Sequence, residues 1–306
     1  MAVDDQLRLT LDARDHCVSR LVLVGVDGSA ASAAACGWAA RYASKTGAQL
    51  VVASAWQPHQ AEGTPEEFAA RRADVQALLD GPWSAPARAT GVAPHTVLMN
   101  GPPDVLLAEA DSDNADLVVV GSRGAGGFAS LHLGSVAHHL THHTTRPLAI
   151  VPEPTAGPEV KTIVVGVDGS AGSAAAVDWC AAVAPNLGAH VVAVLVFEPL
   201  IEWVTEDNPK SWRRLAEKEL AEWVAPLRDR GGRVDTRIIE DIHPVAALAD
   251  AATEHSAQLI VVGTHGLGGF TKMRLGGVAL QLVHHVGLPV VLVPPTSPHG
   301  SQGQTG

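Results

Sequence analysis

The stretch Val118–Ser135, VVVGSRGAGGFASLHLGS, begins as a run of β-branched residues, breaks into a cluster of glycines and ends in Gly134 and Ser135. Glycines adopt positive φ angles without strain and let a ligand approach the main chain closely. Consecutive N–H groups in such a loop form a concave site for oxyanions, and a helix starting at Ser135 would add unpaired N–H groups. The stretch therefore predicts a phosphate-binding loop, with a glycine-rich turn that merely connects a strand to a helix as the alternative.

The same arrangement occurs twice in the chain. LVVVGSRGAGGF, which starts at Leu117, recurs as LIVVGTHGLGGF from Leu259. LVLVGVDGSAASAAACGWAA, which starts at Leu21, recurs as TIVVGVDGSAGSAAAVDWCA from Thr162. The repeated unit is far longer than a solenoid repeat, so each copy is expected to be a complete domain with its own core. Two loops with the same glycine spacing favour phosphate binding over a plain connecting turn.

Two other phosphate-binding motifs are excluded by the sequence. No G-x-x-x-x-G-K-[ST] occurs, so neither loop is of the Walker A type. The dinucleotide-binding fingerprint should follow the first strand, but the first strand here is followed by VDGSA.

Short β-rich runs alternate with helical segments in each copy, and this alternation is typical of a parallel sheet covered by helices on both faces. In the first copy we expect strands at Leu21–Val26, Leu50–Ala55, Thr96–Met99, Leu117–Val120 and Leu148–Val151, and helices near Ser29–Thr46, Pro65–Leu79, Pro103–Asp111 and Ser135–Thr144. The segments Glu66–Leu79 and Trp212–Leu227 are interpreted as amphipathic covering helices, and Trp38 and Trp179 as core residues. The predicted fold class is α/β, with two tandem doubly wound, five-stranded parallel sheets of Rossmann-like or flavodoxin-like type. In such a fold the glycine loops lie at the crevice formed by the carboxyl ends of the strands.

The repeats also set the expected domain organisation. We expect an N-terminal extension over residues 1–18, one domain over 19–152 (the first copy), another over 161–294 (the second copy) and a disordered tail over 295–306. Residues 153–160, in a segment rich in Pro and Gly, are expected to be a linker.

Composition limits the classes of function. The 306 residues include 21 basic and 32 acidic ones, giving a formal net charge of −11, and they show no basic stripe typical of a nucleic-acid binder. No apolar run approaches the roughly 20 residues that span a bilayer, and the acidic, polar N-terminus is unlike a secretory signal. Cys17, Cys36 and Cys180 form neither a disulfide framework nor a metal-binding spacing. We therefore expect a cytoplasmic protein that binds neither nucleic acid nor membrane.

The spacing Gly-x-x-Gly, nine residues, then Gly-Ser resembles the ATP-binding signature of the universal stress protein family; its residues are Gly121, Gly124, Gly134 and Ser135. The VGVDGS segments and the closing PLAIVP and PVVLVP segments resemble the same family. The whole chain is similar to the tandem universal stress proteins common in actinobacteria. The resemblance implies one adenine-nucleotide site per copy. It also implies pairing of the two closing strands, which would give one chain the shape of a dimer. Association of whole chains into a homodimer stays open.

The resemblance further implies a role for each matching residue. The glycine loop with Gly134 and Ser135 would hold the triphosphate, Asp27 would lie beside the adenosine and phosphates, and Ala55 would border the adenine. The residues implied in the first copy are Gly25, Asp27, Ala55, Gly101, Gly121, Arg123, Gly124, Gly126, Gly127, Gly134, Ser135 and Val136. Those implied in the second copy are Gly166, Asp168, Val196, Gly263, His265, Gly266, Gly268, Gly269, Gly276, Gly277 and Val278. Mg²⁺ would enter only with the ATP, held by its phosphates and a carboxylate.

The two copies differ within these sets. Ser135 is matched by Gly277, so the second site lacks a hydroxyl donor, and Arg123 is matched by His265, which is mostly neutral at pH 7 when unperturbed. Gly101 is matched near His243, which would narrow the second site. We therefore expect the first site to bind ATP more tightly.

Histidines near the end of the first copy suggest a metal site, because side chains at i and i+4 share a helix face. These are His138, His139, His142 and His143, whereas the second copy keeps only His284 and His285. With no neighbouring carboxylate cluster, a solvated helix end is favoured, where histidine suits the helix dipole.

No nucleophile–base pair stands out, so no catalytic residue is assigned. The leading hypothesis is an ATP-binding stress-response protein whose regulatory state is set by nucleotide occupancy. A slow ATPase or phosphotransferase that uses the same pockets is one alternative. An interaction scaffold with a vestigial second site is the other.

Overall fold

The computed structural model describes residues 20–57, 64–103, 115–124, 133–153, 159–197, 211–266 and 275–295. The elements of the first copy are β1 (Leu21–Gly25), α2 (Ala30–Thr46), β2 (Gln49–Trp56), α3 (Pro65–Leu78), the helical turn η1 (Leu79–Trp83), α4 (Ala85–Arg88), β3 (His95–Asn100), β4 (Leu117–Gly121), α6 (Ser135–His143) and β5 (Leu148–Val151). Those of the second copy are β6 (Thr162–Gly166), α7 (Ala171–Leu187), β7 (His190–Phe197), α8 (Ser211–Trp223), α9 (Ala225–Asp229), β8 (Arg233–Glu240), α10 (Pro244–Glu254), β9 (Leu259–Gly263), α11 (Gly277–His285) and β10 (Val290–Val293).

Each copy contributes five parallel strands to one ten-stranded sheet, in the order β3-β2-β1-β4-β5-β10-β9-β6-β7-β8. The direction of strand addition reverses between β1 and β4, and again between β6 and β9. In doubly wound sheets, ligands bind outside the carboxyl ends of the strands at such a switch point. The predicted α/β fold with two parallel five-stranded units is therefore confirmed, and it places a potential site in each copy.

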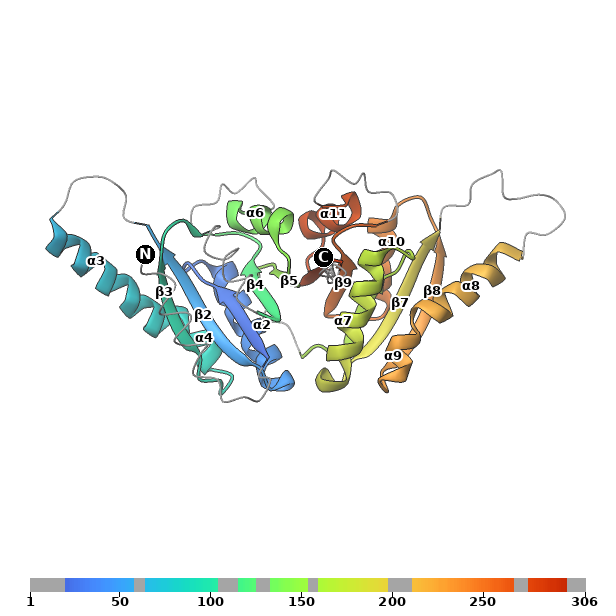
Figure 1. Ribbon diagram of the computed structural model, residues 1–306, viewed down its shortest axis with the longest axis horizontal. Helices are drawn as coiled ribbons and strands as arrows, with labels where there is room; N and C mark the ends of the chain where they lie inside the picture. The colour runs from blue at the N-terminus through green and yellow to red at the C-terminus, as the bar shows by residue number, and fades with distance from the viewer. Residues whose placement is uncertain are drawn as a thin grey trace, which may run out of the picture.

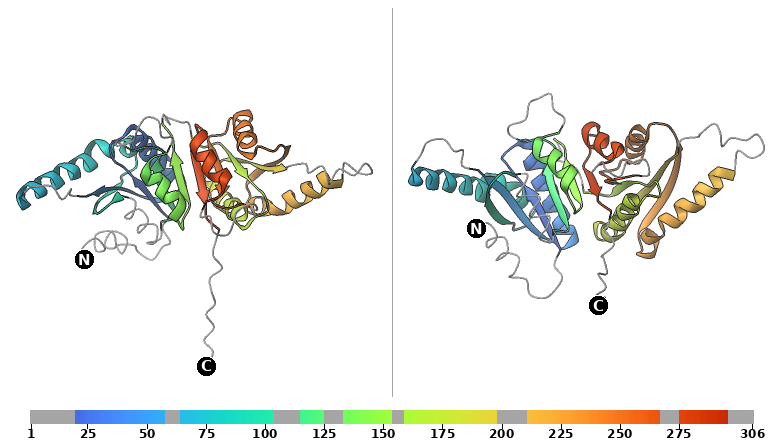
Figure 2. Two further views of the ribbon diagram at one scale, coloured as in Figure 1. Left: turned by 90° about the horizontal axis from the view of Figure 1, so that it is seen from above. Right: turned by 45° about the horizontal axis from the view of Figure 1, so that its top comes forward.

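The two copies are joined by antiparallel pairing of β5 with β10, in which Ile150 faces Val290 and Leu148 faces Leu292. Figures 1 and 2 show the copies on either side of this junction, with α6 and α11 next to each other across it. The expectation that the closing strands pair within the chain is confirmed. Each copy thereby occupies the place that a second subunit would take in a dimer.

Helices cover both faces of the sheet because successive strand residues point in opposite directions. Val22 and Val24 contribute to a core cluster beneath α2, α4, α7 and α9, whereas Leu21 and Leu23 contribute to another beneath α6, α10 and α11. Both clusters contain residues of both copies. The junction is therefore part of the hydrophobic core, and the sheet is continuous in packing as well as in hydrogen bonding.

The aromatic residues of α2 and α7 pack against one another at this junction. Trp38 is buried and stacks on Tyr42 at a ring distance of 5.5 Å, and Tyr42 stacks on Trp179 of the second copy at 6.2 Å. The interpretation of both tryptophans as core residues holds, with Trp179 only partly buried.

The interpretation of Glu66–Leu79 as a covering helix holds for its C-terminal end alone, where Val75 packs against the core and Leu79 is buried. No residue of α3 itself is buried, and Figure 1 shows the helix projecting from the end of the molecule. In the middle of α3, Arg72 donates to the Leu98 carbonyl at 3.4 Å. The equivalent prediction for Trp212–Leu227 fits better, because Ala216, Leu220 and Leu227 are buried.

The short helical segments η1 and α4 were not predicted. Gly81 kinks the chain, with φ −100° and ψ −110°. Pro86 lies in the first turn of α4, where its missing N–H has no helical partner to lose. The predicted helix Pro103–Asp111 lies outside the described residues apart from Pro103, as do the predicted extension and almost all of the tail. None of the helices in the described ranges has the length and apolar character that a membrane span needs.

Gly121 shows how closely α2 packs on the sheet. A Cβ at this position would lie 2.7 Å from the carbonyl carbon of Ala31 and 2.9 Å from the nitrogen of Ser32. Gly121→Ala should lower the free energy of unfolding by about 1–3 kcal/mol, as overpacking against main-chain atoms does. Urea-induced unfolding measures the change. Gly287→Ala is the control, since its Cβ would meet no atom within 4 Å, and an equal loss in both variants would contradict the packing explanation.

Two buried thiols predict an alkaline loss of stability. Burial raises the pKa of Cys36 to about 11 and also raises the pKa of Cys180. In the unfolded chain these thiols ionise near pH 8.5, so above that pH the unfolded state loses protons first and is favoured. Each thiol should lower the free energy of unfolding by about 1.4 kcal/mol per pH unit until its folded-state pKa is reached.

The measurement is urea unfolding of the wild type and of Cys36→Ala Cys180→Ala between about pH 8 and pH 10.5. The double variant should show the shallower decline with pH. Equal slopes in the two proteins would show that these thiols do not contribute to the alkaline loss.

Candidate functional site

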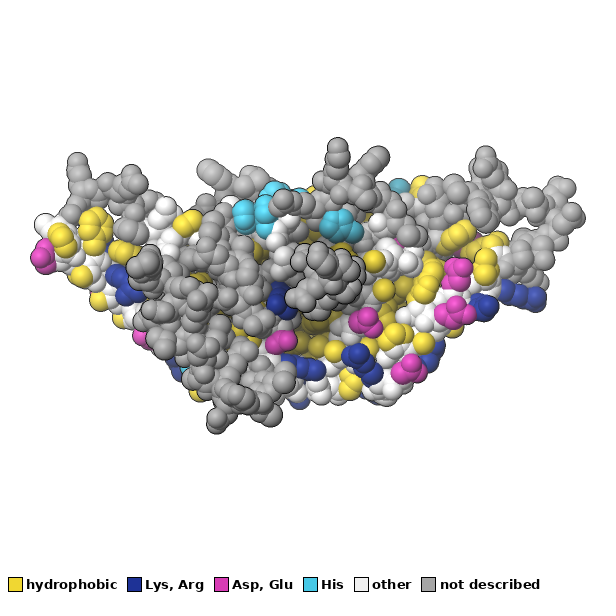
Figure 3. All heavy atoms as spheres, in the orientation of Figure 1, with side chains coloured by type: hydrophobic (Ala, Val, Ile, Leu, Met, Phe, Trp, Pro, Cys, Tyr) yellow, Lys and Arg dark blue, Asp and Glu magenta, His cyan; other side chains and the backbone are white. Residues whose placement is uncertain are grey.

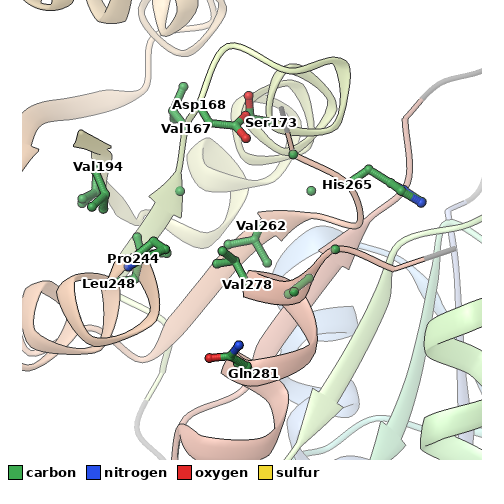
Figure 4. A pocket seen from close by; sticks show the side chains of 17 residues that line it. Val167, Asp168, Ser173, Val194, Pro244, Leu248, Val262, His265, Val278 and Gln281 are labelled. Atoms are coloured by element: carbon green, nitrogen blue, oxygen red, sulfur yellow. The ribbon is translucent and has the colours of Figure 1, made fainter. Parts of the chain in front are cut away.

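A cavity of about 450 Å³ opens at the carboxyl ends of β6, β7 and β9 in the second copy. Its volume lies within the range of about 300–1,000 Å³ found for small-molecule sites. Seventeen residues line it, and Figure 4 shows them arranged around the switch point of the sheet. The cavity therefore lies where the topology of the fold predicts a ligand.

The wall of the cavity has two chemically different parts. Val194, Leu248 and Val262 belong to an apolar part provided by two strands and α10. Asp168 and Ser173 lie at the other part, next to the main chain of the glycine loop. One ligand with a flat apolar group and an anionic group would match both parts.

The turn after β6 fixes the glycine loop in place. Asp168 accepts a hydrogen bond from the Ser170 nitrogen at 3.0 Å, and Ser170 caps α7 by accepting from the Ser173 nitrogen at 3.1 Å. The Ser170 hydroxyl also donates to the His265 carbonyl at 3.2 Å. A Cβ at Gly266 would collide with Asp168 Oδ2. The Asp-Gly-Ser turn and the glycine loop are thus fitted to each other.

The start of α11 completes the polar part. The Gly276 nitrogen donates to the Thr264 carbonyl at 2.7 Å, which closes the loop onto the helix. Gly276 makes no side-chain cap for α11, and Gly277 has open space where a Cβ would stand. The N–H groups of the first helical turn lack partners inside a helix. They are available to an anion that enters this space.

The first copy repeats this geometry. Asp27 accepts from the Ser29 nitrogen at 3.0 Å, and the Ser29 hydroxyl donates to the Arg123 carbonyl at 3.4 Å. The Gly134 nitrogen donates to the Ser122 carbonyl at 2.7 Å. A Cβ at Gly124 would lie 2.6 Å from Asp27 Oδ2. The Asp-Gly-Ser turn therefore meets the glycine loop in the same way at both switch points.

The structure brings the predicted second-copy residues together. Every one of them that lies in the described ranges lines the cavity, namely Gly166, Asp168, Val196, Gly263, His265, Gly266, Gly276, Gly277 and Val278. In the first copy the described members lie at or just beyond the carboxyl ends of the strands and at the start of α6; they are Gly25, Asp27, Ala55, Gly101, Gly121, Arg123, Gly124, Gly134, Ser135 and Val136. Gly126, Gly127, Gly268 and Gly269 lie outside the described residues.

Several lining residues were missed by sequence analysis. They are Val167, Ser173, Val194, Pro244, Leu248, Val262, Ala279 and Gln281. Helical spacing contained part of the signal, because Leu248 lies four residues after Pro244 and Gln281 four after Gly277, and such pairs share a face. The sequence did not show which face of α10 or α11 turns toward the sheet.

Two of the predicted glycines serve packing as well as the site. A Cβ at Gly121 would meet Ala31, and one at Gly263 would meet the backbone of Gly172. Their bare main chain therefore lets α2 and α7 approach the ends of β4 and β9. These contacts demonstrate a packing role for Gly121 and Gly263. They do not demonstrate the role in ligand approach that the resemblance implies.

The match of Gly101 with the region of His243 needs a correction. The Gly101 nitrogen donates to the Trp56 carbonyl at 3.1 Å, and the Asp241 nitrogen donates to the Phe197 carbonyl at the same distance. Gly101 therefore corresponds to Asp241, beyond the end of β8. Gly101 has φ +128°, a conformation that suits only glycine, so the chain leaves β3 and β8 along different paths.

A tryptophan supports each Asp-Gly-Ser turn, which sequence analysis did not predict. Gly28 has φ +82° and packs against the indole of Trp83, and Gly169 has φ +80° and packs against that of Trp223. Both indoles are half-buried. Each indole therefore packs directly against the glycine of its turn.

His265 enters the site through its carbonyl rather than its ring. Its Nδ1 lies 3.0 Å from the Thr264 hydroxyl, and Figure 4 shows the ring directed away from the apolar part of the wall. The His265 ring therefore does not belong to the apolar part of the cavity wall.

The histidines of α6 lie at its exposed end. The rings of His139 and His143 stack at 4.1 Å and those of His138 and His142 lie 4.8 Å apart, and Figure 3 shows histidine side chains gathered over α6 and α11. Within the described ranges, no three His, Cys, Asp or Glu side chains are grouped so that they could hold a metal ion.

The fold and the site together define a class of protein. It is a duplicated, doubly wound α/β protein with a glycine loop after the fourth strand of each unit. A model of the universal stress protein family matches residues 19–152 and 159–294. The chain therefore belongs to the universal stress protein family, as its motifs predicted.

Relatives extend the match over nearly the whole chain. It is 32% identical over 294 residues to a universal stress protein of Mycolicibacterium smegmatis, covering 90% of this chain and 97% of the relative. It is 30% identical over 303 residues to one of Mycobacterium tuberculosis, covering 89% and 94%. A solved universal stress protein from Archaeoglobus fulgidus has a TM-score of 0.67 at 20% identity, covering 91% of this chain and 100% of that one. The last comparison supports the fold.

The Ser170 hydroxyl is expected to stabilise both α7 and the glycine loop. Ser170→Ala should lower the free energy of unfolding by about 1 kcal/mol through loss of the N-cap and should speed amide hydrogen exchange at Gly266. Ser170→Thr keeps a hydroxyl that both accepts and donates, so it should stay close to wild type in both measurements. Unchanged exchange at Gly266 in Ser170→Ala would show that the bond to His265 does not hold the loop.

Proposed function

We propose that this protein binds ATP, one molecule in each copy, and acts as a regulatory module of the stress response whose state depends on nucleotide occupancy. The observation that carries the proposal is the cavity at the second switch point, where an apolar wall and a cluster of main-chain amides face one space. An adenine ring and a polyphosphate need these two surroundings together.

The residues of the cavity fit the two ends of the nucleotide. Val194, Val196 and Leu248 offer apolar surface to a planar base. Gly266, Gly276 and the first turn of α11 offer N–H groups to phosphate oxygens. A side chain at Gly277, where a Cβ would meet open space, would occupy part of the space that the phosphates require.

The carboxylates of Asp27 and Asp168 lie against the glycines that would hold the phosphates. This position suits a Mg²⁺ ion that arrives with ATP, because magnesium in nucleotide sites is usually held by phosphates with one or two carboxylates. Repulsion between carboxylate and phosphate would favour such an ion between them.

The two sites are proposed to differ in affinity. The first has Arg123 and Ser135 where the second has His265 and Gly277. A guanidinium pairs strongly with phosphate, and Ser135 adds a hydroxyl at the start of α6. ATP should therefore fill the first site at the lower concentration.

Occupancy rather than turnover is the proposed signal. The serines nearest the loops, Ser29 and Ser170, cap helices and donate to main-chain carbonyls, so both hydroxyls are engaged by main-chain atoms. Slow hydrolysis in the same cavities is the second candidate. Incubation with ATP and Mg²⁺ followed by assay for ADP separates the two, because a switch of this kind leaves ATP intact over many binding cycles.

Calorimetric titration with ATP and Mg²⁺ tests the proposal. Wild type should bind two molecules per chain. Gly124→Ala and Gly266→Ala should each weaken one site at least tenfold, since the new methyl group displaces Asp27 or Asp168. Gly124→Ala should remove the tighter phase, and the double variant should bind neither. Gly287→Ala, whose Cβ would meet open space, should keep both sites.

Two outcomes would contradict the proposal. If the double variant bound ATP as well as wild type does, the ATP sites would have to lie elsewhere in the protein. If titration with ATP produced no heat and mass analysis of the denatured protein found no nucleotide, the interaction scaffold would be the remaining hypothesis. Loss of the tighter phase in Gly266→Ala instead would reverse the ranking of the two sites.

A further inference from the structure

A second, smaller cavity of about 160 Å³ lies where the two copies meet. Its lining includes Trp38, Arg41 and Lys45 of α2, Glu159 before β6, and Leu187 at the end of α7. Because α2 runs from the carboxyl end of β1 back to the amino end of β2, its last turns lie at the opposite end of the strands from the proposed ATP site of the first copy. None of the described residues lines both this cavity and the cavity of the second copy. This junction cavity is therefore separate from them.

Arg41 contributes a positive charge to the junction cavity, and no ion pair joins it to another of the described residues. Its Nη2 is buried and has no hydrogen-bond partner among those residues, and burial lowers the pKa of the guanidinium. Arginine nevertheless stays protonated in proteins. A buried donor left unsatisfied costs about 1–3 kcal/mol, and more when it is charged. Such a group in a folded protein points to an ion or water that belongs there.

The other charges at the cavity do not neutralise Arg41. Lys45 Nζ lies 3.1 Å from Glu159 Oε1, so the one carboxylate of the lining is paired with the one lysine. The charge that remains is the guanidinium of Arg41. A positive cavity in a chain of net charge −11 selects for an anion.

The size of the cavity limits what that anion can be. It is smaller than the roughly 300–1,000 Å³ of sites for larger organic ligands, but it exceeds the about 30 Å³ that one water occupies in the liquid. A guanidinium binds tetrahedral and planar oxyanions through paired N–H groups. We propose that the junction cavity binds one compact oxyanion of the phosphate class, and that this ion connects the two copies through Arg41.

Of the two matched helices, α2 and α7, only α2 carries the residues of such a site. Ser29 and Ser170 cap α2 and α7 in the same way, and this alignment places Ala182 opposite Arg41 and Asn186 opposite Lys45. The repeat therefore lacks both cations in the second copy. A stoichiometry of one distinguishes this site from the two proposed ATP sites.

Equilibrium dialysis with radiolabelled inorganic phosphate tests the proposal, at constant ionic strength in chloride. The protein is Gly124→Ala Gly266→Ala, so that phosphate bound at the glycine loops does not contribute. It should bind one phosphate per chain saturably. Adding Arg41→Gln should weaken binding at least tenfold, and Arg41→Lys should fall between the two because it keeps the charge without the paired donors.

Arg213→Gln, on the exposed surface of α8, is the control and should bind phosphate normally. Circular dichroism and thermal unfolding show whether each variant is folded, and Arg41→Lys supplies the comparison if Arg41→Gln is not. A parallel series with acetate shows whether a carboxylate can replace phosphate. No saturable binding of either anion, or equal binding with and without Arg41, would overturn the proposal, and neither result bears on ATP.

Discussion

The antiparallel pairing of β5 with β10 is the interaction on which the arrangement of the whole molecule depends. All residues of these two short strands are buried, so either strand alone would form an apolar edge open to association with other chains. Each strand also anchors a glycine loop. The Ser122 nitrogen donates to the Val151 carbonyl and the Thr264 nitrogen donates to the Val293 carbonyl, both at 2.9 Å. One pairing thus completes the ten-stranded sheet and anchors the loops of both sites.

Glycine serves two physical purposes around each site, and the structure separates them. At Gly121 a side chain would strike α2, so its absence lets a helix approach the sheet. At Gly277 a side chain would meet open space, so the fold itself does not require glycine there. The first kind of glycine positions the elements and the second leaves the cavity open. A glycine motif therefore indicates a ligand site only at positions where the packing of a helix on the sheet does not itself require glycine.

The sequence predicted those parts of the site that follow strand ends, because a parallel sheet brings its carboxyl ends together whatever the helices do. This is why Asp168 and Gly266 meet as expected. Leu248 could not be assigned, because its position depends on how α10 is rotated against the sheet. Gly101 was matched wrongly because the offset between the copies is 241 − 101 = 140 here but 263 − 121 = 142 at Gly121, so a count at a fixed offset loses the register. Local sequence patterns were enough to predict the glycine loops, whereas the positions of the other site residues depend on long-range packing.

Duplication explains why the two copies can differ without loss of the fold. The hydrogen bonds that shape each loop involve main-chain atoms or the shared Asp and Ser residues, so Arg123 can become His265 while the loop keeps its form. The same holds for α2 and α7, where the face that packs on the sheet is alanine-rich in both and the variation between Arg41 and Ala182 falls at the junction. Since a single chain contains both copies, a residue beside the pseudo-twofold axis occurs only once. A homodimer would repeat it, so tandem duplication permits a lone charged group at the junction that two identical subunits could not have.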